Sequence, residues 1–300
     1  MYLKAPKSIP EQIQRLKDHN IYVDDDRFAE KCLKEITYYR LTGYGLQFRK
    51  SPQDSDCIPN TTLRNIYNIY LFDEDLRHFL RKYIEIVEVS SRALIANGFS
   101  ALKCTEPPYD QHYDINNYFD KEHAEKILVS IQQEKDHYKD SLIVKHHNKS
   151  YEGKMPLWVM TELLPFSALS KLYHCMYISD KEKIAKNINL GWRILENHLH
   201  CLAVLRNKCA HAARLYNTSL SPKVALSPHF LRRHLEVKCD TLFAYIIILL
   251  QHLPEKDQRQ NCIQDIYNLI DKYKDNIDLE LIGFPENYTL ILQDNVKGGV

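Results

Sequence analysis

Apolar side chains recur along this chain at steps of three and four residues, which is the period of a helix that buries one face. The clearest run spans residues 61–97, with apolar positions at Leu63, Ile66, Tyr70, Leu76, Leu80, Tyr83, Ile84 and Val87. We expect one long amphipathic helix here, or two helices joined end to end. A second run, from Trp192 to about Leu215, predicts another helix.

Caps, prolines and glycines mark the ends of the remaining elements. A capping-box pattern at Ser8 and Glu11 and an acidic start at 24–26 open the first two helices. The expected helices span about residues 8–17, 24–41, 156–165, 167–176, 180–188, 228–253 and 255–274, followed by an irregular end. Residues 120–148 are dense in Lys, Glu and His and predict a solvated helical excursion.

The chain contains only eight glycines and has no strand–turn–strand signature, so we predict an all-α fold. Its organisation is expected to comprise an N-terminal helical region over 1–60, a helical core over 61–253, and a C-terminal helix and tail over 254–300. The core carries a charged helical insertion at about 105–155. An apolar content of 44% is enough to bury a sizeable core.

Charge is nearly balanced, with 40 basic and 39 acidic side chains and a net charge of +1. Such a chain has no long-range field that attracts nucleic acid, so any RNA-binding surface must be a local patch. The eight cysteines form no Cys-x2-Cys pair, and the N-terminus lacks the pattern of a signal peptide. The longest apolar run, Leu242 to Leu250, is too short to cross a membrane and predicts a buried core helix. These features favour a cytoplasmic protein with free thiols.

The stretch from Leu205 to His211 reads LRNKCAH and lies near the end of the 192–215 helix. An ideal helix places four side chains in one apolar stripe: Leu195, Leu199, Leu202 and Cys209. Arg206 falls inside that stripe, while Asn207, His211 and Arg214 belong to a polar stripe beside it. A desolvated arginine requires a charge partner or an anionic ligand. In the structural alternative, Arg206 pairs with Glu85 or Glu88 of the long helix, and His211 is an ordinary core residue.

Five stretches, taken in order, resemble blocks of a known family. They are ITYYRLTGY (36–44), IYLFDEDLRHFL (69–80), IEIVEVSSR (84–92), PLWVMTELLPFSALSKLY (156–173) and LRNKCAHAARLYN (205–217). Over roughly residues 8 to 220 the chain is similar to the Abi family, the AbiD/AbiF-like abortive-infection proteins of bacteria. That family is placed in the HEPN superfamily of helical domains, whose signature is an arginine, a polar residue and a histidine four to six residues further on. Arg206, Asn207 and His211 match this signature.

The resemblance implies a HEPN-type helical bundle that cleaves RNA without a metal, with Arg206, Asn207 and His211 as catalytic residues. Histidine exchanges protons near neutral pH, and the fixed charge of arginine suits a phosphate that gains charge in the transition state. On a straight helix Arg206 and His211 lie about 140° apart. The second Arg-x4-His pair, Arg193 and His198, lacks the asparagine. We therefore expect a homodimer in which each chain gives one arginine and one histidine to a composite site.

Two further groups of residues are expected to support this chemistry. The expected RNA contacts are Arg214, Arg40, Tyr39, Arg232 and Arg233. A buried ion network on the long helix is expected to comprise Asp73, Arg77, Glu85, Glu88 and Arg92. No residues have zinc-ligand spacing or form a carboxylate set suited to magnesium, so no metal or cofactor is expected.

The resemblance also implies partners. These are RNA and a restraining partner, either a noncoding RNA or an antitoxin protein, whereas neither a membrane nor DNA is expected to bind. Two other functions stay open at this point. One is a non-catalytic module that grips a structured RNA, and the other is a helical interaction scaffold with a buried Arg–Glu pair.

Overall fold

A computed structural model describes Leu3 and residues 5–297. This part of the chain forms fourteen α-helices and four short 3-10 helices, and it contains isolated β-bridges but no β-strand. The prediction of an all-α fold is therefore confirmed. None of the helices in the described residues combines the length and the apolar content needed to cross a bilayer.

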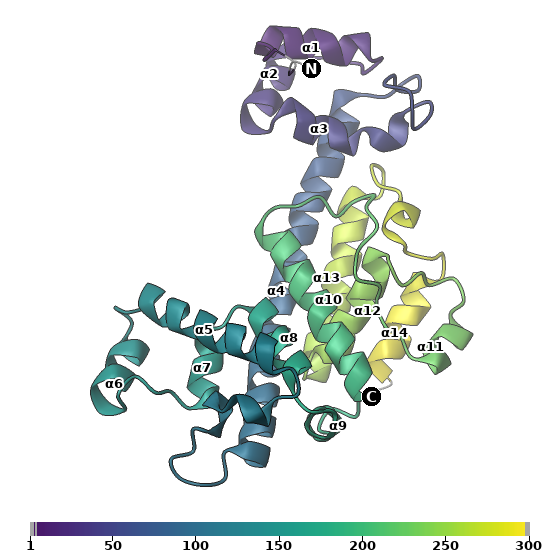
Figure 1. The fold of residues 1–300 in the computed structure, drawn as a ribbon. Coiled ribbons are helices and arrows are strands. Elements are labelled where there is room, and N and C mark those ends of the chain that lie inside the picture. Colours follow the sequence, from purple (N-terminus) through teal and green to yellow (C-terminus); the bar gives the residue numbers. More distant parts are fainter. Residues whose placement is uncertain (1–2, 4, 298–300) are drawn as a thin grey trace.

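The molecule is organised around α4 (Leu63–Lys103), a single helix of 41 residues. The hydroxyl of Thr62 caps it by accepting a hydrogen bond from the Asn65 N–H at 3.1 Å. The apolar positions of the 61–97 run lie on its buried face, apart from the half-buried Tyr70. Figure 1 shows that α4 extends from the N-terminal helices along the rest of the protein.

Three helices surround the first turns of α4: α1 (Ile9–Asp18), α2 (Asp26–Glu35) and α3 (Tyr38–Tyr44) (Figure 1). The expected single helix over 24–41 is wrong, because the backbone becomes extended at Ile36, with φ −131° and ψ 140°. The buried Ile36 side chain is held in the core, and the next residue, Thr37, caps a new helix by accepting from the Arg40 N–H. The 3-10 helix η1 (Leu46–Phe48) follows.

The expected solvated excursion is helical but is divided and partly packed. After η2 (Gln111–Tyr113) and η3 (Ile115–Asn117), it forms α5 (Lys121–His137) and α6 (Leu142–Ser150). Helix α5 buries Ala124, Ile127 and Ile131, and it packs on α8 (Phe166–Cys175). The prediction of a solvated excursion is therefore wrong for this face of α5, since three apolar residues at helical spacing were enough to make it buried. The next helices are α7 (Leu157–Leu163), α8 (Phe166–Cys175) and α9 (Ile178–Lys186).

The C-terminal part differs from its prediction in two places. The expected helix over 228–253 is two helices, α11 (Pro228–Arg233) and α12 (Leu242–His252). All residues from Leu242 to Leu250 are buried, whereas α11 buries none. The exposed basic residues of α11 and the fully buried residues of α12 belong to different environments, so the chain bends between the two helices. After α13 (Lys256–Tyr273) and η4 (Leu279–Ile282), the expected irregular end forms α14 (Tyr288–Lys297), which packs on α12 and α13.

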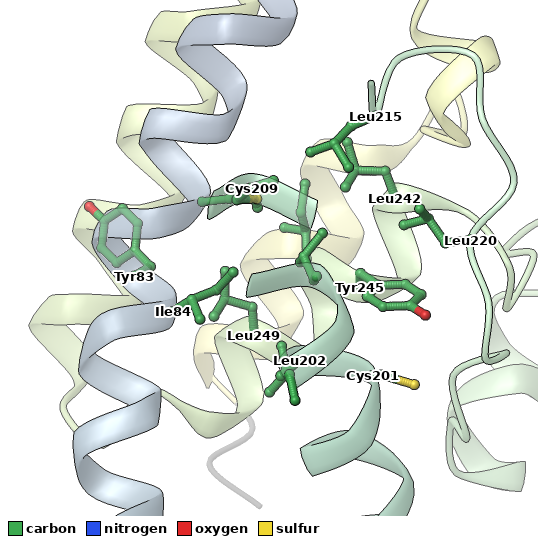
Figure 2. Close-up of a cluster of buried hydrophobic side chains, with 14 of the residues drawn as sticks. Tyr83, Ile84, Cys201, Leu202, Cys209, Leu215, Leu220, Leu242, Tyr245 and Leu249 are labelled. Atoms are coloured by element: carbon green, nitrogen blue, oxygen red, sulfur yellow. The ribbon is translucent and has the colours of Figure 1, made fainter. Parts of the chain in front are cut away.

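The core beside the motif helix is built from α4, α10 (Trp192–Ala210) and α12. Figure 2 shows Leu202 and Cys209 of α10 gathered with Ile84 of α4 and Leu249 of α12, and all four side chains are buried. Leu215 returns to the same cluster from the segment after α10 (Figure 2). The motif is thereby anchored to the core on both sides of its polar residues. All eight cysteines carry free thiols.

Candidate functional site

The rotation of α10 about its axis is fixed by its apolar stripe. All four predicted stripe residues are buried: Leu195, Leu199, Leu202 and Cys209. Burial raises the pKa of the Cys209 thiol to about 12, so this side chain inside the LRNKCAH motif stays protonated and belongs to the core.

Arg206 lies at the edge of that stripe rather than inside it. Its Nε–H donates to Oε2 of Glu88 at 3.3 Å, and its side chain is 40% exposed. The expected pairing with Glu88 is therefore present, but full burial of Arg206 is wrong. The long side chain carries its charged end outward while its stem covers apolar surface. The other oxygen of Glu88 accepts from the guanidinium of Arg92 at 2.6 Å, so one carboxylate holds two arginines.

His211 is the residue at which α10 ends. Its N–H donates to the Asn207 carbonyl at 3.0 Å, and the residue is exposed, so it is not a core histidine. The helix was expected to continue to about Leu215, but Ala212 adopts a left-handed conformation with φ 51°. The Ala213 N–H then donates back to the Lys208 carbonyl at 2.8 Å. The left-handed residue comes after His211, so His211 keeps its place at the end of the helix. The break therefore does not bring its side chain toward Arg206.

We expect Ala212→Gly to raise the free energy of unfolding by about 0.5–1 kcal/mol. The left-handed conformation costs an L-residue about 1–2 kcal/mol, and the greater freedom of glycine in the unfolded chain offsets part of the gain. Urea denaturation would measure the change. The control is Ala210→Gly, two residues earlier and still helical, which should lower stability by a similar amount. A loss in both variants would contradict the strain at Ala212.

A buried carboxylate holds the segment that follows His211. Asp73 of α4 accepts from the Tyr44 hydroxyl at 2.7 Å and from the guanidinium of Arg77. It also accepts from the backbone N–H groups of Leu215 at 3.1 Å and Tyr216 at 2.8 Å. This carboxylate therefore ties α3, α4 and the post-motif segment together.

The predicted ion network consists of two separate parts. One joins Asp73 and Arg77, and the other joins Glu88, Arg92 and Arg206. Glu85 belongs to neither and is exposed, so its inclusion was wrong. The reason is its position on the solvent-facing stripe of α4, four residues before the exposed Val89.

His211 opens onto a cleft of about 810 Å³ between the N-terminal helices and the post-motif segment. The cleft also contains three of the predicted RNA contacts, Tyr39, Arg40 and Arg214. The guanidinium of Arg40 donates to the Ala212 carbonyl, and that of Arg214 donates to the Gly43 carbonyl. A Cβ at Gly43 would lie 3.3 Å from the Arg214 guanidinium, so glycine allows this close approach.

Sequence reasoning missed three further residues of the cleft: Arg15, His19 and Arg49. No pattern in the sequence distinguished these three residues. In a sequence, an arginine or histidine on the polar side of a short helix cannot be distinguished from one that simply faces solvent. Only the folding of α1 and η1 toward the end of α10 brings them beside His211.

Other predicted residues lie away from this cleft. Arg206 and Asn207 do not line it. Arg232 and Arg233 are exposed on α11, and Arg233 pairs with Asp294 of α14 at 3.4 Å. Figure 1 shows α11 at the lower right, well away from α3 at the top.

The second Arg-x4-His pair has a different environment. His198 is buried, with Nδ1 3.0 Å from Nε2 of His252 and Nε2 2.9 Å from the Ala225 carbonyl. Burial lowers the pKa of His198 to about 4, so it is neutral at neutral pH. His198 is therefore closed off from solvent, whereas His211 is exposed. Across the described residues, no group of three or more His, Cys, Asp or Glu side chains is arranged to hold a metal ion.

Comparison with known proteins identifies one family. The family model described as Abi-like protein matches residues 31–217, which run from α2 to the segment after α10. No curated protein and no solved structure matches the chain. The matched residues include the motif, the ion networks and much of the cleft, and they cover more than half of the sequence. The chain therefore belongs to the Abi-like protein family.

Proposed function

We propose that this protein is a metal-independent endoribonuclease of the HEPN type, which acts as a homodimer in a bacterial abortive-infection system. Membership of the Abi-like family indicates the abortive-infection role. The observation that carries the nuclease proposal is the end of α10. There, a half-exposed Arg206 and an exposed His211 are held by core anchors, and His211 opens onto a basic cleft.

The proposed reaction is an internal transfer within RNA. The 2'-oxygen forms a bond to the adjacent phosphorus as the bond from phosphorus to the 5'-oxygen breaks. This leaves a cyclic phosphate and a 5'-hydroxyl. One proton leaves the 2'-hydroxyl and one is added to the 5'-oxygen, and His211 is suited to proton transfer because histidine titrates near neutrality.

The hydrogen bond that Arg206 donates to Glu88 leaves its guanidinium able to bind a phosphate. Glu88 accepts from Nε, so the two terminal nitrogens of the guanidinium remain available as a fork of donors. Such a fork matches two oxygens of a phosphate and stabilises the negative charge that develops in the transition state. Asn207, one residue further along the helix, supplies a neutral amide that can orient the sugar or the histidine.

The proposed site requires a residue from a second chain. Arg206 and His211 diverge on one helix, and His198 of the second pair is buried in the core. In a twofold dimer, the arginine of one protomer and the histidine of its partner can face one phosphate. RNA is the substrate, and a noncoding RNA or an antitoxin protein restrains the enzyme in healthy cells.

Mixing two inactive variants tests the composite site. We expect Arg206→Ala and His211→Ala to be inactive alone and active when co-expressed. In the mixed dimer one site has lost both residues, while the other keeps both. Random pairing should then restore about a quarter of wild-type cleavage. Cleavage of total RNA in EDTA, with analysis of the RNA ends, would measure it.

Co-expression of two copies of the same variant is the control. No recovery in the mixed dimer would contradict the composite site. Wild-type protein that binds RNA tightly but leaves it uncut would instead support the non-catalytic RNA-binding alternative.

A further inference from the structure

The cleft beside His211 is lined by basic residues, although the net charge of the whole protein is only +1. Its lining includes Arg15 from α1, Arg40 from α3, Arg49 after η1 and Arg214 after α10, together with two histidines. Neither aspartate nor glutamate is among the lining residues. Several guanidinium groups that share one concavity repel each other, and a bound polyanion relieves this repulsion.

None of these four arginines has an ion-pair partner within the described residues. Outside the cleft, five arginines pair with a carboxylate, as Arg64 does with Asp24 at 2.7 Å. Arg40 and Arg214 each donate to one backbone carbonyl. A guanidinium carries five N–H donors, so most of theirs remain available to a ligand. The cleft therefore gathers four arginines that no carboxylate pairs with in the described residues, while its His19 lies 3.2 Å from Asp56.

Aromatic rings accompany the charges. Tyr39 is 88% exposed although it lies in a helix that packs on α4. Tyr38 is half-buried beside it, and the nearby Arg15 guanidinium opposes the rise in the Tyr38 pKa that burial causes. An exposed ring next to several guanidinium groups is the combination that binds both parts of a nucleotide, since bases stack on the ring and phosphates bind the arginines.

We propose that this cleft binds an unpaired stretch of RNA and delivers it to His211. The inference rests on the proposed nuclease function and names its substrate class, which is single-stranded RNA. A volume of about 810 Å³ falls within the range of pockets that enclose a small ligand, so the cleft accepts one or two nucleotides. A duplex keeps its bases stacked on each other, and Tyr39 could not reach their faces.

The proposal gives the N-terminal helices a role in the substrate site. Arg40 and Arg214 are bonded across the gap between α3 and the post-motif segment, which holds one wall of the cleft at a fixed position relative to His211. Arg15 and Arg49 also line the cleft, and neither makes an ion pair within the described residues. These two arginines are the ones to remove, because neither makes the bonds of Arg40 and Arg214 that join α3 to the post-motif segment.

The test uses the full-length protein with His211→Ala, so that RNA is not cleaved, and a fluorescein-labelled single-stranded RNA of twelve nucleotides. Anisotropy titrations compare Arg15→Ala/Arg49→Ala with the control Arg27→Ala/Arg193→Ala. The control removes the same charge from exposed sites outside the cleft. We expect at least about a tenfold loss of affinity in the first variant, with a shallower salt dependence, and less than about twofold in the control.

A second pair of variants tests stacking. Tyr39→Ala should weaken binding about tenfold, whereas Tyr22→Ala, an exposed tyrosine that does not line the cleft, should leave it unchanged. Unchanged melting temperatures would exclude unfolding as the cause. Equal losses in cleft and control variants would overturn the proposal. A duplex or a single-stranded DNA of the same sequence that binds as tightly as the RNA would also overturn it.

The nuclease proposal can fail separately from this one. If wild-type protein cuts no RNA but the cleft variants still lose affinity for the single strand, the cleft is an RNA site without the proposed catalysis. If wild-type protein cuts RNA in EDTA and Arg15→Ala/Arg49→Ala cuts it with an unchanged KM, the nuclease stands and the cleft proposal fails.

Discussion

Replacing His211 by alanine is expected to lower RNA cleavage by about 10²–10⁴-fold, which is the usual contribution of a general acid–base group. The fold should stay intact, because His211 is exposed and only its backbone N–H closes the last turn of α10. Alanine retains that N–H. Single-turnover cleavage in EDTA, together with thermal unfolding of the same samples, would measure both effects.

His200→Ala is the matched control for this substitution. His200 is also exposed on α10, but it lies outside the cleft, so its loss should leave both cleavage and stability unchanged. Wild-type cleavage by His211→Ala would refute the catalytic role. A large drop in its melting temperature would instead indicate a structural role that its exposure does not suggest.

The second large effect is expected in stability. Asp73→Ala should lower the free energy of unfolding by about 3–5 kcal/mol, the range for breaking a buried ion pair by removing one partner. It leaves Arg77 without its carboxylate and the N–H groups of Leu215 and Tyr216 without an acceptor in the core. Urea denaturation at neutral pH would measure the loss.

Asp75→Ala separates this effect from a general loss of charge on α4. Asp75 accepts from Lys272 and Tyr273, each at 2.8 Å, but it is partly exposed. An exposed pair contributes about 0–1 kcal/mol, so this variant should be much less destabilised. Equal losses at the two positions would contradict the role of Asp73 in holding the post-motif segment.

Patterns that depend on neighbours along one helix could be predicted from the sequence. The all-α class, the buried stripe of α10 and the buried run from Leu242 to Leu250 are confirmed. These features follow from helical periodicity, which is local. A pairing of Arg206 with Glu85 or Glu88 was the structural alternative, because a desolvated arginine requires a charge partner, and the structure selects Glu88.

Predictions failed where packing overruled local preference. Ile36 leaves the helix because its side chain is needed in the core, and α5 packs through only three apolar residues. The C-terminal residues 288–297 are helical because α12 and α13 provide a surface for them. In each case the deciding contacts come from residues distant in the sequence, and periodicity within one segment contains no information about them.

The sequence by itself determined that the chain is helical, that it belongs with the Abi-like proteins, and that Arg206, Asn207 and His211 are its chemically distinctive residues. Only the tertiary structure decided that His211 is exposed at a helix end, that His198 is buried, and that Arg15 and Arg49 lie beside His211. The physical reason is that a residue's type and spacing fix which groups are present, whereas long-range packing fixes their exposure. Packing also fixes which charges share one cleft, and the reactivity of a side chain depends on both.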